Sequence, residues 1–79
     1  MKKTLKLYEI PVVVEKDMDG SFFAVAPSLQ GCYTSGKTFS EALENIKDVI
    51  ALILEDMRSA RQTIPKRKPV SFMSVEVFA

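Results

Sequence analysis

Apolar and polar residues alternate along much of this chain, and the alternation predicts four β-strands. The first three strands are expected at Leu5–Glu15, Ser21–Ala26 and Cys32–Ser35. The fourth is expected at Val70–Phe78, where both faces carry apolar side chains, as in a strand inside a sheet or at a subunit interface. Pro11 cannot donate a ladder hydrogen bond, which favours an edge position or a bulge for the first strand.

Two short segments between the strands have the composition of tight turns. Lys16–Gly20 is polar and places glycine where a positive φ is needed. Pro27 ends the second strand, and Gly31 permits the next reversal of the chain. The first three strands are therefore expected to form an antiparallel meander.

A period of 3.6 residues replaces the alternation after Gly36 and predicts one long helix from Phe39 to about Arg61. Thr38 and Glu41 have the spacing of a capping box, in which each side chain accepts a hydrogen bond at the start of the helix. Such a helix is roughly 34 Å long, against about 20 Å for a six-residue strand. The predicted order is βββαβ, an α+β fold with one helix on one sheet, in a single domain over residues 1–79.

Composition narrows the classes of function. Eleven basic and ten acidic residues give the 79-residue chain a net charge of +1, so no strong field attracts nucleic acid or a membrane. Histidine is absent, and the single cysteine, Cys32, excludes an internal disulfide and suits a reducing cytoplasm. The apolar runs are too short for a membrane span, and residues 1–15 lack the features of a signal peptide. A core this small favours oligomerisation, and the long helix with the apolar fourth strand predicts a homodimer.

Several of these positions together resemble the HicB family of antitoxins. The resemblance covers Val12 to Ile53 and rests on an ordered set of residues: Asp19-Gly20, Phe22-Phe23-Ala24, Pro27, Leu29, Gly31-Cys32, Thr34, Gly36, Thr38, Glu41-Ala42 and Asn45. It implies a partial RNase H-like fold without nuclease chemistry, which binds and blocks HicA, a small mRNA-cleaving toxin. Ser28 and Gln30 depart from the usual residues of this turn. Many members add a C-terminal DNA-binding module; this chain stops at Ala79, so DNA binding is not expected.

Candidate contact residues follow from this combination. Acidic groups and one aromatic residue of the first hairpin are candidates for contact with a basic toxin: Glu15, Asp17, Asp19 and Phe22. The distal half of the helix and the fourth strand are candidates for a dimer contact: Leu52, Leu54, Met57, Val75 and Val77. No catalytic, metal-binding or cofactor-binding constellation is expected, so the protein is predicted to be non-enzymatic.

Two alternatives compete with the antitoxin hypothesis. Glu15, Asp17 and Asp19 could hold divalent metal ions for RNase H-type cleavage, although aspartate beside glycine is what a hairpin turn selects. The chain could also be a scaffold that binds a different protein. Lys66-Arg67-Lys68 is the basic cluster of the sequence, and we interpret it as a solvated loop, because no aromatic residues accompany it for stacking on bases.

Overall fold

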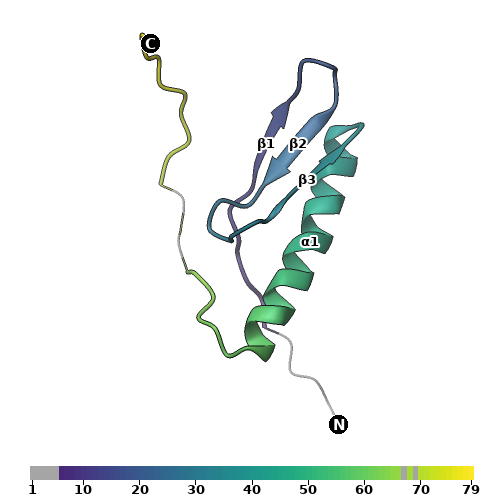
Figure 1. Cartoon of the computed structure of the whole chain (residues 1–79), viewed down its shortest axis with the longest axis vertical. Coiled ribbons are helices and arrows are strands. Elements are labelled where there is room, and N and C mark those ends of the chain that lie inside the picture. Colours follow the sequence, from purple (N-terminus) through teal and green to yellow (C-terminus); the bar gives the residue numbers. More distant parts are fainter. Residues whose placement is uncertain (1–5, 67, 69) are drawn as a thin grey trace.

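A three-stranded antiparallel sheet packed against one helix forms the body of the protein (Figure 1). The computed structural model describes residues 6–66, 68 and 70–79. The elements are β1 (Val13–Lys16), β2 (Phe22–Val25), β3 (Tyr33–Gly36) and α1 (Phe39–Ser59), and the sheet order is β1-β2-β3. The predicted meander, the single long helix and the α+β class are confirmed.

The turn between β1 and β2 fixes the register of the hairpin. Gly20 N donates to Asp17 O at 3.0 Å, and Asp17 N donates to Ser21 O at 2.7 Å. Gly20 has a φ of +90°, as predicted for this position. This is a type I turn followed by a glycine bulge, which is a common three-residue hairpin loop. It sets Val14 opposite Ala24 and Glu15 opposite Phe23.

The loop between β2 and β3 returns one side chain to the core. Leu29 N donates to Ala26 O at 3.1 Å, which places Pro27 at the second position of a β-turn, where its fixed φ is favourable. Ala26 N donates to Cys32 O at 2.9 Å, and Gly31 takes a φ of +68°. Leu29 is thereby buried beneath the distal half of α1.

The helix lies close to the sheet because most of the buried residues between them are small. The buried core cluster consists of Ala24, Ala26, Leu29, Cys32, Ala42 and Ile46. Gly36 is also buried, and a Cβ atom added to it would meet the backbone of the first helical turn, at 2.9 Å from Ala42 Cα and in closer contact with Ala42 N. Asn45 Nδ2 donates to Ser35 O at 2.9 Å and ties the helix to β3.

Both ends of α1 are capped. Thr38 Oγ1 accepts from Glu41 N at 3.1 Å as predicted, whereas Glu41 Oε1 accepts from Lys37 N at 3.2 Å, one residue before the cap. The helix ends at Ser59 rather than near Arg61. Arg61 has a φ of +55°, and Gln62 N donates to Met57 O at 2.8 Å, the bond that defines a Schellman motif. The described ranges contain no helix with both the length and the apolar surface needed to cross a bilayer.

Two sequence predictions differ from the structure. The first strand begins at Val13, since Pro11 lacks the N–H that would extend the ladder. The fourth strand predicted at Val70–Phe78 is not formed in the single chain: the described residues 70–79 contain no strand (Figure 1). A strand needs a partner as well as a suitable pattern, and here none is bonded to it. Leu5 of the first predicted strand, and Arg67 and Pro69 of the predicted loop and basic cluster, lie outside the described residues.

The close approach at Gly36 makes a strong prediction for stability. Gly36→Ala places a methyl group against the backbone of Ala42, and overpacking of this kind costs about 1–3 kcal/mol. Urea denaturation should show this loss in the free energy of unfolding. Ser35→Ala, at the exposed neighbouring position, is the control and should stay within about 0.5 kcal/mol of the wild type. Equal stabilities of the two variants would contradict the packing described above.

Candidate functional site

One face of the sheet is covered by α1, and the opposite face, here called the open face, is not covered by any described element. Cross-strand partners point to the same side of a sheet, so the register separates the two faces. Ala24 is fully buried and marks the helix side, together with its partners Val14 and Thr34. The open face is made by the alternate residues Val13, Glu15, Phe23, Val25, Tyr33 and Ser35.

Aromatic and aliphatic side chains form the centre of the open face. The rings of Phe23 and Tyr33 lie 6.0 Å apart between centroids, with 32° between their planes. Tyr33 is 60% exposed, while Phe23, Val13 and Val25 are half-buried. An exposed apolar patch that includes a tyrosine is typical of a protein-binding surface.

Acidic groups lie at the turn end of this surface. Glu15 belongs to the open face, and Asp17 and Asp19 lie in the adjoining β1–β2 turn. Asp19 Oδ1 accepts hydrogen bonds from Ser21 Oγ at 2.6 Å and from Ser21 N at 2.9 Å. These two bonds stabilise the charged carboxylate and lower the pKa of Asp19 below its ordinary value of 3.8. Asp19 is therefore part of the turn as well as a source of negative charge.

Phe22 is the predicted contact residue that the structure separates from the others. Its cross-strand partner Lys16 shares the helix side of the sheet, and the Lys16 ammonium lies 5.8 Å from the centroid of the Phe22 ring. The Phe22 ring also meets Phe39 edge to face at 6.4 Å. Phe22 thus packs between β2 and the start of α1, while Glu15 faces the other way.

Phe23, Val25 and Tyr33 were not among the contact residues predicted from the sequence. Their signal was present in the period-two pattern that predicted the strands. That pattern shows which residues share a face, but it does not show which face a helix will cover. The structure shows that α1 covers the face of Ala24 and leaves the face of Phe23, Val25 and Tyr33 uncovered.

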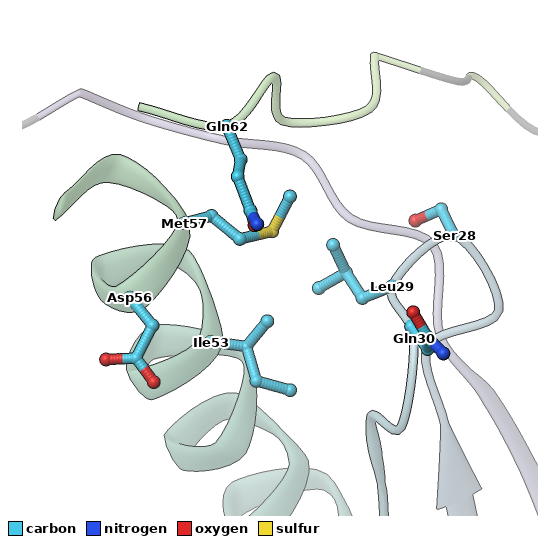
Figure 2. A pocket seen from close by; sticks show the side chains of 7 residues that line it. All are labelled: Ser28, Leu29, Gln30, Ile53, Asp56, Met57 and Gln62. Carbon is cyan, nitrogen blue, oxygen red and sulfur yellow. The ribbon is translucent and has the colours of Figure 1, made fainter. Parts of the chain in front are cut away.

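A shallow pocket of about 460 Å³ lies between the β2–β3 loop and the end of α1 (Figure 2). Leu29, Ile53 and Met57 point into it, and Ser28, Gln30, Asp56 and Gln62 complete its lining. The Ser28 hydroxyl is buried without a hydrogen-bond partner. The seven residues that line the pocket do not form a recognisable catalytic group.

The predicted dimer residues fall into two groups. Leu54 and Met57 are half-buried and pack against the core of their own chain, so only part of each side chain is accessible to a second copy. Leu52 is 65% exposed on the helix, and Val75 and Val77 are 75% and 78% exposed in the C-terminal segment. The exposed members are therefore free to contact another molecule.

The described residues offer neither a reactive thiolate nor a cluster of metal ligands. Cys32 is buried, and burial raises the pKa of its thiol, which disfavours the reactive thiolate. Within residues 6–66, 68 and 70–79, no three His, Cys, Asp or Glu side chains are grouped closely enough to hold a metal ion. Asp17 and Asp19 serve the hairpin turn, as the sequence indicated.

Comparison with known proteins identifies the family. A family model described as the HicB-like antitoxin of a bacterial toxin-antitoxin system matches residues 10–77. The chain belongs to this antitoxin family. The match extends beyond the motif-bearing residues Val12 to Ile53 and includes most of the C-terminal segment.

Family relatives occur in both bacteria and archaea. A UPF0150 protein of Synechocystis is 38% identical over 72 residues, which cover 86% of this chain and 91% of that protein. A UPF0150 protein of Helicobacter pylori is 38% identical over 68 residues, covering 86% of this chain and 93% of the relative. A UPF0150 protein of Thermoplasma acidophilum is 42% identical over 55 residues, which cover 70% of this chain and 80% of that protein. No solved structure matches the chain significantly.

The hydrogen bonds at Asp19 predict a measurable titration. A carboxyl NMR titration should give Asp19 a pKa below 3.8, and Ser21→Ala should raise it by removing the hydroxyl bond. Because the folded pKa is lowered, the stabilisation from this group is present above pH 3.8 and is lost as the pH falls through the folded pKa. An unchanged Asp19 titration in Ser21→Ala would contradict the role of the hydroxyl.

Proposed function

We propose that this protein is the antitoxin of a HicA-type toxin, a small mRNA-cleaving protein that it binds and blocks. Membership of the HicB-like antitoxin family is the observation that carries the proposal. The fold supports it, because the open face offers an apolar centre and an acidic end for a protein partner. In this role the protein acts by binding and performs no catalysis of its own.

The mechanism is coverage of the surface that the toxin uses to bind and cut RNA. Phe23 and Tyr33 bury apolar area at the centre of the contact. A surface that binds RNA is basic, since it must neutralise phosphates. Glu15, Asp17 and Asp19 meet that basic surface at one end of the contact, which speeds association and orients the toxin. The bound antitoxin then excludes RNA by occupying its site.

We also propose that the protein is a cytoplasmic homodimer whose sheet gains a fourth strand. The exposed apolar residues of the C-terminal segment and Leu52 support a homodimer. The single thiol of Cys32 suits action in the reducing cytoplasm, where an mRNA-cleaving toxin would work. Addition of the C-terminal segment to the sheet would complete the βββαβ order of the proposed partial RNase H-like fold. Binding of operator DNA is not part of the proposed role.

Co-expression tests the proposed role directly. The small basic protein encoded next to this gene should arrest growth alone, and this chain should restore growth and co-purify with that protein. Failure of both readouts would overturn the antitoxin role. Cleavage of RNA or RNA–DNA hybrids by this chain with Mg²⁺ or Mn²⁺, abolished in Asp19→Asn, would instead favour the nuclease alternative.

Tyr33 provides a matched test of the open face. Tyr33→Ala removes an exposed ring from the apolar part of the open face, and we expect toxin affinity to fall roughly tenfold or more. Phe39→Ala is the control, since the Phe39 ring has a similar exposure but lies on α1. Isothermal titration calorimetry measures both affinities. Equal loss of affinity in the two variants, or loss only in Phe39→Ala, would assign the toxin to a different surface.

A further inference from the structure

The C-terminal segment has the pattern of a strand without a partner strand. Six large apolar side chains between residues 70 and 78 are each at least 71% exposed: Val70, Phe72, Met73, Val75, Val77 and Phe78. Apolar exposure on this scale marks a surface that another molecule covers. The match to the antitoxin family reaches residue 77, so the segment belongs to the domain.

One edge of the sheet is open to receive such a strand. Asp17 N bonds to Ser21 O, and the ladder of β1 with β2 therefore uses the odd-numbered residues of β1. Val14 and Lys16 consequently direct their backbone N–H and C=O groups away from β2, and β1 is the terminal strand of the sheet. An unpaired edge of this kind is a template for strand addition.

The other edge of the sheet is already engaged by the helix. Ala26 N bonds to Cys32 O, so Ser35 directs its carbonyl away from β2, where it accepts from Asn45 Nδ2 at 2.9 Å. The first turn of α1 also packs directly on Gly36 at the end of β3. Strand addition is thus favoured at β1.

If the C-terminal segment is extended beside β1, one of its faces joins the helix side of the sheet and the other joins the open face. Met73, Val75 and Val77 fall on one side of an extended strand, and Phe72, Ser74, Glu76 and Phe78 fall on the other, with the polar pair at its middle. Next to β1, the apolar side would extend the helix-side row of Val12 and Val14, which are only half-buried. Ser74 and Glu76 would then join the open face together with the rings of Phe72 and Phe78, next to its apolar patch.

We propose that the C-terminal segment of each chain adds as a fourth strand to the β1 edge of a second copy, in a reciprocal exchange. In the single chain the segment runs on the β1 side of the sheet in Figure 1 but is not bonded to it. Pro65 fixes its own φ and favours an extended conformation at Ile64, so the chain leaves α1 in a direction that can carry the segment to a second copy. Exchange of identical segments is an accessible route to a twofold dimer.

This inference deepens only the dimer part of the proposed function and does not depend on toxin binding. It specifies which residues the partner copy contributes and which backbone groups receive them. A dimer that forms without the segment would leave the proposed homodimer intact and refute the exchange. The two ideas therefore fail separately.

Val75→Asp and Ser74→Asp form a matched pair for the test. Both side chains are exposed in the single chain, so neither substitution should unfold it, and both add the same charge to adjacent positions. Val75→Asp should raise the dimer dissociation constant roughly tenfold or more, measured by light scattering over a dilution series. Ser74→Asp should leave it within about threefold of the wild type, since its side chain would face outwards.

Hydrogen exchange decides which copy provides the strand. We expect alternate backbone amides of residues 72–78 and the amides of Val14 and Lys16 to be protected in the wild-type dimer. That protection should disappear on dilution to the monomer and in Val75→Asp. Protection that persists in the monomer would place the segment on its own sheet and overturn the exchange. Absence of protection in a stable dimer, or equal weakening by Ser74→Asp, would also overturn it.

Discussion

The close approach of α1 to β3 determines the rest of this small structure. Gly36 has no side chain at the point where the first helical turn crosses the strand, and Ala42 on the helix is equally small and fully buried. Asn45 fixes the same crossing with a hydrogen bond to the carbonyl of Ser35. The helix is therefore held over the β3 side of the sheet. As a consequence, the β1 edge and the whole open face remain available to other molecules.

The hairpin turn links the fold to the electrostatics of the proposed binding surface. Asp19 accepts two hydrogen bonds from Ser21, which keep its carboxylate charged and hold the turn in one conformation. The bulge at Gly20 sets the register, and the register assigns Glu15 and Phe23 to the open face. Asp19 thus combines its structural role in the turn with the recognition role proposed for it, so removing its charge for a binding study also perturbs the turn.

Local features of the chain were predictable from sequence, and features set by distant contacts were not. The turn at Gly20, the reversal at Pro27 and the cap at Thr38 depend on neighbouring residues, and all three occur as predicted. The side occupied by Phe22 depends on where the helix packs, which alternation alone does not specify. Val70–Phe78 has a strand pattern, but a strand forms only where another backbone offers hydrogen bonds. Phe23, Val25 and Tyr33 were not predicted as open-face residues because alternation alone does not show which face of the sheet the helix covers.

The two proposed contacts use different parts of the sheet and are compatible with simultaneous occupation. Toxin binding uses the side chains of the open face, whereas strand exchange uses backbone groups at the β1 edge. A fourth strand beside β1 would add Ser74 and Glu76 to the open face and place a further carboxylate on the side of Glu15. The toxin would then gain contacts in the dimer that the monomer lacks. By linkage, a toxin that binds the dimer more tightly also stabilises the dimer to the same extent.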